Sequence, residues 1–133
     1  MQPVLDVAAA VVRSNGLILI ARRPAGVHMG GLWEFPGGKV EPGETREQAV
    51  VRELQEELAI DTVPVRLLLT TEHAYPEKSV RLHFYECELA DGYPFRANGL
   101  AIQWVRPDEL RRFEFPPANL PLLDLLIPPD PVP

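Results

Sequence analysis

The sequence predicts an α+β domain, and two features of its hydrophobic pattern lead to that class. Aliphatic runs of strand length lie on both sides of one amphipathic helical segment, residues 45–58. A second, apolar helical segment follows near the end of the chain. Strands that enclose an early helix, with more helix at the end, are typical of a mixed domain. The 133 residues suffice for one domain of this kind.

The chain is expected to begin with a β-hairpin. Residues 7–12 and 17–21 are aliphatic, β-branched runs, and Ser14-Asn15-Gly16 separates them. An Asn-Gly pair tolerates the positive φ angles of a tight hairpin turn. Residues 26–43 are rich in glycine and proline, so we expect mostly loop there, with a short extended piece at residues 32–35.

Residues 45–58 are predicted to form an α-helix. Glu44 and Thr45 can cap its start, and Glu47 places negative charge near the positive end of the helix dipole. Apolar residues recur at helical spacing and give the helix one buried stripe, formed by Val50, Val51, Leu54 and Leu58.

The second half of the chain returns to strands. Residues 63–70 and 80–89 are predicted strands joined through residues 75–78, and residues 101–105 are a shorter strand. Pro107 opens a short helix, because proline is favoured in a first turn.

The C-terminal segment is predicted to add one helix and a tail. Residues 120–127 are apolar enough to dock on the sheet as a helix. Residues 128–133 are rich in proline and predict an extended, mobile tail. We therefore expect a single domain over residues 1–127.

Composition and charge exclude several classes of protein. Nineteen acidic against thirteen basic residues give a net charge of −6, which argues against direct binding of a nucleic-acid polymer. No apolar run is long enough to span a membrane, and the first residues do not resemble a signal peptide. Cys87 is the single cysteine and is expected to pack within a strand. We expect a cytoplasmic monomer or homodimer, whose contact with a phosphorylated small molecule would need a cation.

Three glutamates on the predicted helix are candidates for a metal site. Glu53, Glu56 and Glu57 are three and four residues apart, so their carboxylates converge on one face. Like charges at this spacing destabilise an isolated helix by roughly 0.2–0.5 kcal/mol per pair, and a divalent cation would turn repulsion into ligation. Oxygen ligands suit Mg²⁺, with Mn²⁺ as a substitute. The simpler alternative is a solvated acidic face, but Gly37 and Gly38 would let the backbone approach a ligand closely.

Residues 37–60 carry a recognisable signature. They read GGKVEPGETREQAVVRELQEELAI, with Gly38, Glu44 and Arg52-Glu53 at characteristic spacing. This stretch resembles the Nudix box, the signature of hydrolases that cleave nucleoside diphosphates linked to another group. One position departs from that pattern, because Ala59 stands where the family usually has glycine. Since this residue ends the helix, we expect alanine to alter the cap rather than the chemistry.

Other segments resemble the MutT-like branch of the same family. They are Ala21-Arg22-Arg23, His28-Met29, WEFPGGK at residues 33–39 and FPPAN at residues 115–119. The resemblance implies the Nudix fold, a mixed β-sheet sandwiched between helices in an α/β/α arrangement. It also implies Mg²⁺-dependent hydrolysis of a nucleoside triphosphate, notably 8-oxo-dGTP, to the monophosphate and pyrophosphate. CTP pyrophosphohydrolases share much of this pattern.

The resemblance also implies residue roles. The metal ligands would be Glu53, Glu56, Glu57 and the carbonyl of Gly37. Arg52 would orient a box glutamate through a charge-assisted hydrogen bond, and Glu44 would support it. Asn119 would read the base edge, because an amide offers both a donor and an acceptor. The residues that would contact the nucleotide are Arg23, His28, Glu34, Phe35, Pro36, Gly37, Gly38, Lys39, Lys78 and Asn119.

The same side chains have simpler structural interpretations. Arg23 and Lys78 could be solvated charges, and Phe35 could belong to the core. Asn119 follows two prolines and could cap the last helix, a role that asparagine fills well. Ordinary packing is the favoured expectation for His73, His83 and Trp104.

A second departure from the family pattern is Asn98, where many relatives have a glutamate that serves as a metal ligand or base. An amide accepts no proton at neutral pH, so either Glu53 or Glu56 acts as the base or turnover is reduced. Three hypotheses follow. The protein removes oxidised nucleoside triphosphates, or it hydrolyses another substrate such as CTP or a nucleotide sugar, or it is a weakly active nucleotide-binding module.

Overall fold

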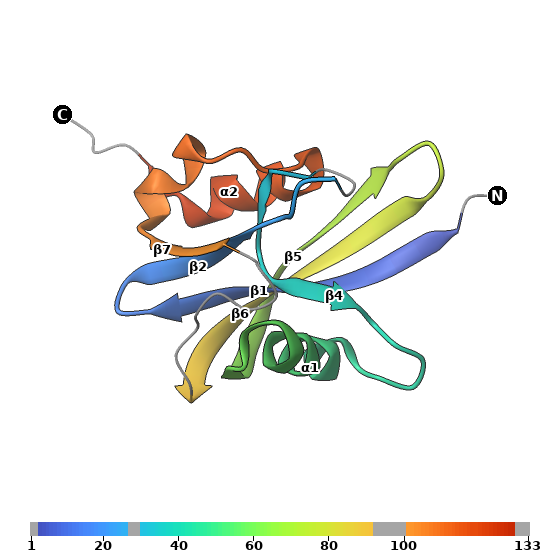
Figure 1. Cartoon of the computed structure of the whole chain (residues 1–133), viewed down its shortest axis with the longest axis horizontal. Helices are drawn as coiled ribbons and strands as arrows, with labels where there is room; N and C mark the ends of the chain where they lie inside the picture. Colours follow the sequence, from blue (N-terminus) through green and yellow to red (C-terminus); the bar gives the residue numbers. More distant parts are fainter. Residues whose placement is uncertain (1–2, 27–29, 92–100, 130–133) are drawn as a thin grey trace.

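A mixed sheet with helices on both faces forms the centre of the molecule (Figure 1). The computed structural model describes residues 3–26, 30–91 and 101–129, and within these ranges the sheet has seven strands. The strands are β1 (Val4–Ser14), β2 (Leu17–Arg22), β3 (Trp33–Glu34), β4 (Gly37–Lys39), β5 (Asp61–Ala74), β6 (Ser79–Asp91) and β7 (Ala101–Val105). The helices are α1 (Arg46–Leu58), the 3₁₀ helices η1 (Pro107–Arg112) and η2 (Pro117–Asn119), and α2 (Leu120–Leu126). The predicted α+β class is confirmed.

Strand β1 is the centre of the sheet. The strand order is β3, β2, β1, β6, β5, while β4 also pairs with β1 and β7 with β2. β1 runs parallel to β6 and antiparallel to β2 and β4. It shares one edge between two partners, since Arg13 pairs with Ile18 of β2 and Val7 pairs with Lys39 of β4. This sharing places the short glycine strand β4 beside the first half of β1.

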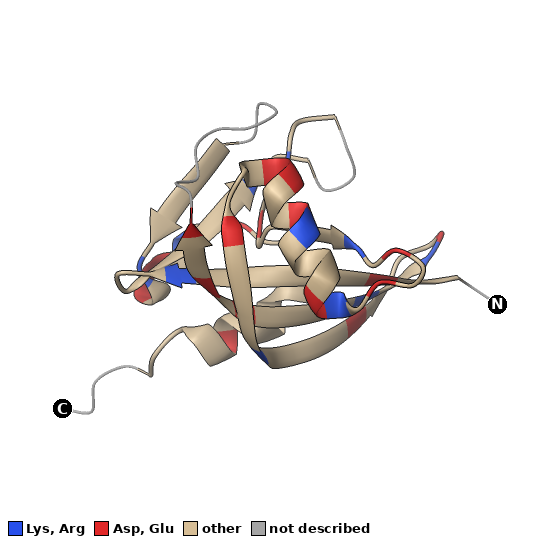
Figure 2. Cartoon of the chain, turned by 90° about the horizontal axis from the view of Figure 1, so that it is seen from below, with Lys and Arg blue, Asp and Glu red and all other residues tan. Residues whose placement is uncertain are grey.

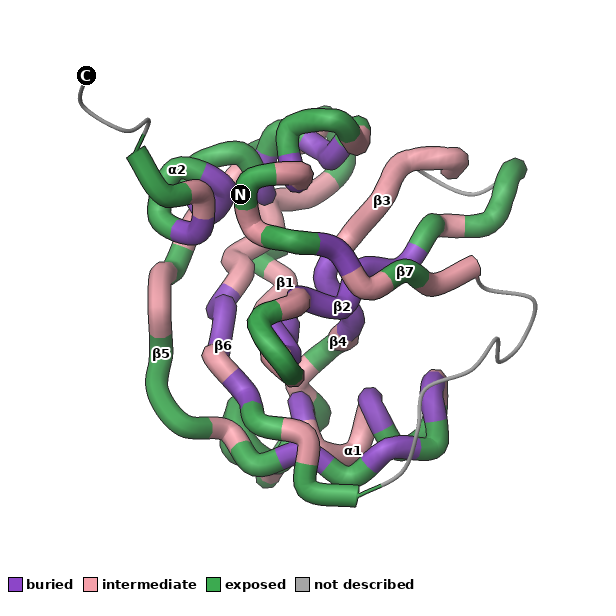
Figure 3. The backbone as a smooth tube through the Cα atoms, turned by 90° about the vertical axis from the view of Figure 1, so that its left-hand side faces the viewer, coloured by how far each residue is buried: buried purple, intermediate pink, exposed green. Residues whose placement is uncertain are grey.

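The two faces of β1 supply two hydrophobic cores. Ala8, Ala10 and Val12 point into the core under α1, and Ala9 and Val11 point into the core under α2. In Figure 3 the buried segments run through the central strands, whereas much of the edge strand β5 is exposed. Alternate side chains of a strand face opposite sides, so a continuous apolar run such as this marks a strand covered on both faces.

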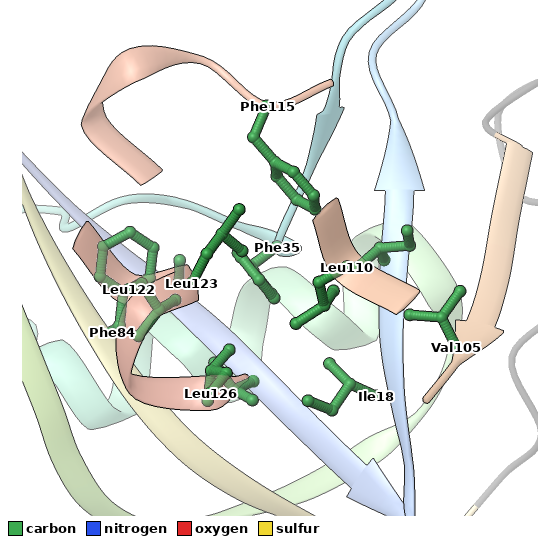
Figure 4. Packing of buried hydrophobic residues seen from close by; sticks show 12 residues of the cluster. Ile18, Phe35, Phe84, Val105, Leu110, Phe115, Leu122, Leu123 and Leu126 are labelled. Carbon is green, nitrogen blue, oxygen red and sulfur yellow. The ribbon is translucent and has the colours of Figure 1, made fainter. Parts of the chain in front are cut away.

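Aromatic and leucine side chains fill the core on the α2 side (Figure 4). The ring of Phe35 stacks on Phe115 with centroids 5.2 Å apart and meets Phe84 edge-on at 6.1 Å. Leu122 and Leu126 of α2 pack in the same core. Burying each of these side chains contributes roughly 1.5–3 kcal/mol, which holds the C-terminal segment on the sheet.

Most strands extend further than predicted, and one was predicted as loop. β1, β5 and β6 each gain residues at both ends because cross-strand pairing continues beyond the apolar runs, for example at Glu72 and Arg81. Gly37–Lys39 forms β4, although its glycines predicted a loop. A Cβ on Gly37 would lie 2.2 Å from the carbonyl oxygen of Ala8, so only glycine allows this strand to pair so closely.

Helix α1 begins and ends with recognisable caps. The Thr45 side chain accepts a hydrogen bond from the Gln48 amide, and the Gln48 side chain accepts one from the Thr45 amide, which completes a capping box. Val50, Leu54 and Leu58 are buried as predicted, whereas Val51 is only half-buried and Ala49 is buried in its place. Ala59 ends the helix in the left-handed conformation, with φ of 55°. Alanine is strained there by roughly 1–2 kcal/mol, whereas glycine is not.

The C-terminal elements confirm the predicted order. The short helix that begins at Pro107 is a 3₁₀ helix. The last helix ends at Leu126, because the backbone of the next residue, Ile127, is extended. Cys87 is buried, Trp104 packs against the core under α1, and burial raises the pKa of the Cys87 thiol to about 12. Among the described residues, no helix is long and apolar enough to cross a bilayer.

Replacing Ala59 with glycine is expected to stabilise the protein. The A59G variant removes the strain of the left-handed backbone, partly offset by the greater freedom of glycine in the unfolded chain. The free energy of unfolding from urea titration should rise by about 0.5–1 kcal/mol. The control is A49G within the same helix, which should lower it by about 1 kcal/mol or more. A destabilised A59G protein would contradict the assigned strain.

Candidate active site

A cavity of about 310 Å³ collects side chains from segments far apart in the sequence. It is bounded by β1, β6, the region of β3 and β4, the end of α1, the β5–β6 turn and η2. The predicted nucleotide contacts that line it are Arg23, Glu34, Phe35, Gly37, Gly38, Lys39, Lys78 and Asn119. Glu57, predicted as a metal ligand, lines the same cavity.

Aliphatic residues form part of the cavity wall, and the sequence interpretation did not identify them. Leu5 and Val7 of β1 lie beside Val80 and Leu82 of the parallel strand β6. Their spacing of two residues puts each pair on one face of its strand, which is the available sequence signal. An apolar wall of this kind can accept the flat face of a ring.

Two further expectations need comment. Pro36 does not line the cavity; it is buried, and its carbonyl accepts a hydrogen bond from the Ala10 amide at 2.8 Å, which continues the pairing along β1. His28 and Asn98 lie outside the described residues.

Gly38 brings the backbone of β4 against a carboxylate of α1. A Cβ at this position would lie 2.4 Å from the carboxyl carbon of Glu53, so any larger residue would push that side chain away. Gly37, one position earlier, is held equally close to β1. The two glycines therefore allow sheet and helix to meet where the acidic residues of α1 gather.

Arg52 joins the acidic residues to the sheet. Its guanidinium donates two hydrogen bonds to Glu44, at 2.7 and 3.0 Å, and one to the carbonyl of Lys39 at 3.0 Å. Its Nη1 contacts Glu53 at 3.0 Å and Glu56 at 3.3 Å. Figure 2 shows this mixture of acidic and basic residues on α1. Arg52 thus fixes three glutamates relative to β4.

The charges in this network shift one another's protonation. The hydrogen bonds from Arg52, followed by that from the Glu41 amide, lower the pKa of Glu44 to about 2. Those from Glu44 and Glu53 raise the pKa of Arg52 above its ordinary value, although burial opposes this. Glu44 and Arg52 are therefore a stable ion pair at every physiological pH.

Glu57 is in a different environment from its neighbours. Burial, followed by the charges of Glu53 and Glu34, raises its pKa to about 8. A half-buried carboxyl that faces a cavity and is repelled by other carboxylates favours either a proton or a cation. This combination of burial and like charge marks Glu57 as the most perturbed carboxyl group described in the site.

Another part of the cavity wall carries a second ion pair. Arg23 Nη1 contacts Glu34 Oε2 at 2.8 Å, and both side chains are largely buried beside the cavity. Burial raises the pKa of Glu34, although its hydrogen bond with Arg23 opposes the shift. Phe35, the next residue, is 3% exposed, and it belongs to the core as well as to the cavity wall.

Asn119 does not cap the last helix. It precedes α2, but its side chain makes no capping hydrogen bond and its backbone is already helical. It is 7% exposed and lines the cavity together with Pro116 and Ala118. The alternative interpretation of Asn119 as a simple helix cap is therefore wrong.

The β5–β6 turn forms another part of the wall. Tyr75 donates its amide hydrogen to the carbonyl of Lys78 at 2.8 Å, which closes the turn. Both residues line the cavity, and the Tyr75 ring meets His73 edge-on at 4.7 Å. The sequence predicts that Lys78 lies in this turn, but it indicates no role for Tyr75.

The donor chemistry of the site fits a hard divalent cation. Among the described residues, no three His, Cys, Asp or Glu side chains are arranged to hold a metal ion, because Glu53 and Glu56 both turn toward Arg52. The available ligands are nevertheless carboxylate and carbonyl oxygens, which Mg²⁺ and Mn²⁺ prefer. Burial raises the pKa of Glu57, and the negative charges of Glu53 and Glu34 add to this shift.

The stability of the metal-free protein is expected to depend on the pH through Glu57. Its pKa is about 8 in the folded chain against an ordinary value of 4.5, so folding takes up a proton between these values. The free energy of unfolding therefore falls as the pH rises through this window. In thermal unfolding with a chelator present, the melting temperature of E57Q relative to that of wild type should rise from about pH 5 to about pH 8. E47Q, on the same helix, is the control, and a pH-independent difference for E57Q would contradict the assignment.

Comparison with proteins of known sequence supports the resemblance over nearly the whole chain. The family model described as the NUDIX domain matches residues 7–125. The 8-oxo-dGTP diphosphatase of Escherichia coli K12 is 42% identical over 120 residues, which cover 90% of this chain and 93% of that protein. The CTP pyrophosphohydrolase of the same organism is 37% identical over 120 residues, covering 90% of this chain and 89% of that protein.

Solved structures agree with this relationship. The solution structure of the MutT protein of methicillin-resistant Staphylococcus aureus 252, described as a Nudix hydrolase, superposes with a TM-score of 0.79 at 35% identity. The match covers 96% of this chain and 98% of that one. The matched residues 7–125 run from β1 into α2 and include the cavity-lining residues from Val7 to Asn119. The chain therefore belongs to the Nudix family, within its MutT-like branch.

Proposed function

We propose that this protein is a Mg²⁺-dependent hydrolase of nucleoside triphosphates and that its preferred substrate is 8-oxo-dGTP or a related purine nucleotide. The products would be the nucleoside monophosphate and pyrophosphate. One observation carries the proposal: a single cavity is lined by Glu57 of the acidic helix, by the basic residues Arg23 and Lys78, and by the amide of Asn119. Metal ligand, phosphate contacts and base contact are thus available within reach of one nucleotide.

A divalent ion would bind between the acidic helix and β4. Nudix hydrolases generally use a divalent metal, and here Glu53, Glu56, Glu57 and the carbonyl of Gly37 would hold it. The ion supplies neutralisation of the phosphate oxygens and increases the acidity of a water molecule. Arg52 keeps Glu53 and Glu56 close to β4, where their carboxylate oxygens would have to turn from Arg52 toward the ion.

The remaining groups would act on the substrate directly. Arg23, Lys39 and Lys78 line the cavity and offer positive charge to the phosphates. A box glutamate, Glu53 or Glu56, would take the proton of the attacking water, because Asn98 accepts none. In the MutT-like branch attack falls on the β-phosphorus, so that pyrophosphate leaves and no covalent enzyme intermediate forms.

The nucleoside would lie against the apolar wall. Val80 and Leu82 would offer an apolar surface to the base, and Phe35 lines the same cavity. In the side chain of Asn119 the NH2 group can donate a hydrogen bond and the oxygen can accept one, which matches the donors and acceptors on the edge of a purine. An oxidised purine differs from an unmodified one in its pattern of donors and acceptors, so a buried amide can discriminate between the two.

A second candidate substrate is CTP or dCTP. The CTP pyrophosphohydrolase of Escherichia coli is 37% identical to this chain, close to the 42% of the 8-oxo-dGTP diphosphatase. A weakly active nucleotide-binding module is the third candidate, for which Asn98 is the sequence argument. Hydrolysis of nucleotide sugars would release no pyrophosphate.

A panel of nucleotides separates these candidates. We expect kcat/KM for 8-oxo-dGTP to exceed the values for dGTP, CTP, dCTP and ADP-ribose by at least about tenfold, with pyrophosphate as a product. The assay measures Mg²⁺-dependent pyrophosphate release at several substrate concentrations. The E57Q variant is the control for contaminating activity and should turn over at least about tenfold more slowly, since it removes a charged group from the proposed metal site. E47Q should match wild type.

The alternative outcomes are distinct. A higher kcat/KM for CTP or dCTP would replace the proposed substrate but keep the reaction. Cleavage of ADP-ribose without pyrophosphate release from any triphosphate would replace the substrate class. Rates no higher than the blank for every compound would overturn catalysis and favour the binding module.

A further inference from the structure

One hydrogen bond ties the Asn119 turn to the edge strand of the sheet. The Thr71 hydroxyl on β5 donates to the carbonyl oxygen of Ala118 at 2.9 Å, across 47 residues of sequence. Thr71 is half-buried and pairs with Leu82 of β6, whose side chain lines the cavity. Cross-strand partners point to the same face, so Thr71 reaches the turn from the cavity side of the sheet.

The turn itself has few means of fixing its own shape. Pro116, Pro117 and Pro121 carry no amide hydrogen, so none of them can donate a hydrogen bond within the turn or to the sheet. Within the turn, the backbone N–H of Asn119 donates a hydrogen bond to the Pro116 carbonyl at 3.0 Å. The Asn119 side chain makes no hydrogen bond to the start of α2. A contact from outside the turn therefore contributes to its placement.

The acceptor of this hydrogen bond is well placed to control Asn119. Ala118 is 5% exposed and Asn119 is 7% exposed, and both line the cavity. The Ala118 carbonyl belongs to the peptide unit that leads directly into Asn119. A donor fixed on a strand therefore limits rotation of that peptide unit, and with it the direction of the Asn119 side chain.

We propose that Thr71 is a positioning residue for nucleotide binding. Through its hydrogen bond to the Ala118 carbonyl it holds the side-chain amide of Asn119 at the cavity. This inference rests on the proposed function, in which Asn119 contacts the base. Thr71 does not line the cavity, so it acts through the turn. Its loss should therefore weaken binding of the base and leave the chemical step unchanged.

The test compares variants with and without the hydroxyl. Thr71→Val keeps the shape and strand preference of the side chain but cannot donate, Thr71→Ala is a second variant without a donor, and Thr71→Ser restores the donor. For the best substrate of the wild-type protein, KM should rise about three- to tenfold in T71V and T71A, while kcat stays within about twofold. T71S should return KM toward the wild-type value.

A matched control removes a different contact of the C-terminal segment, away from the cavity. Arg111 Nη2 contacts Asp124 Oδ1 at 2.6 Å and so ties η1 to α2 on the exposed surface, and neither residue lines the cavity. R111Q should leave KM unchanged even where it lowers the melting temperature. If R111Q and T71V raise KM equally, the effect of Thr71 is general destabilisation and the inference is wrong.

A double-mutant cycle tests whether Thr71 acts through Asn119. In an N119A background, T71V should add little to the increase in KM, because the side chain that it positions is already gone. Full additivity of the two effects would overturn the inference. So would a fall in kcat with unchanged KM.

Hydrogen exchange separates failure of this inference from failure of the proposed function. The backbone amide hydrogen of Asn119 should exchange about three- to tenfold faster in T71V than in wild type. In T71S its exchange rate should return toward the wild-type value, whatever nucleotide the protein hydrolyses. Unchanged exchange would show that Thr71 does not hold the turn. If the wild-type protein is inactive on every nucleotide but exchange is faster in T71V, the proposed function is wrong. The hydrogen bond from Thr71 would still be shown to hold the turn.

Discussion

The close approach of β4 to helix α1 is the constraint on which the site depends. Gly37 fits against the backbone of β1, and Gly38 fits against the carboxylate of Glu53, with no room for a Cβ at either position. Arg52 then links the helix to the carbonyl of Lys39 and to Glu44 at hydrogen-bond distance. If this strand were further from the helix, Arg52 could not reach the Lys39 carbonyl, and Glu57 would not share a cavity with Arg23 and Lys78.

The arrangement of charge favours a bound cation. The chain carries a net charge of −6, and the cavity contains Glu34 and Glu57 as well as three basic side chains. Arg52 neutralises Glu44 and hydrogen-bonds Glu53 and Glu56, whereas no basic side chain in the described part of the chain forms an ion pair with Glu57. Burial, together with the charges of Glu53 and Glu34, raises the pKa of Glu57 to about 8. A polyphosphate would meet further repulsion at this point unless a metal ion entered with it.

Much of this molecule could be predicted from the sequence, and the failures share a physical origin. Helix α1, its cap at Thr45 and its buried stripe follow from local periodicity, so they were predicted correctly. Strand β4 was predicted as loop, because its pairing depends on space beside Ala8 that only the folded sheet provides. The apolar wall at Val80 and Leu82 and the tether from Thr71 to Ala118 join distant segments, and local pattern carries no record of such contacts. Pro36 lies in the WEFPGGK segment just before the signature, and its carbonyl pairs with Ala10 of β1, which motif position alone does not reveal.

Direct measurement of divalent-ion binding tests the central claim, that the acidic helix and β4 together form a metal site. Titration with Mn²⁺, followed by electron paramagnetic resonance, gives the affinity without any dependence on turnover. We expect one class of bound Mn²⁺ in the wild-type protein, at least about tenfold weaker binding in E57Q, and wild-type affinity in E47Q. Equal affinity in wild type and E57Q, or no bound Mn²⁺ in either, would contradict a metal site at this cavity.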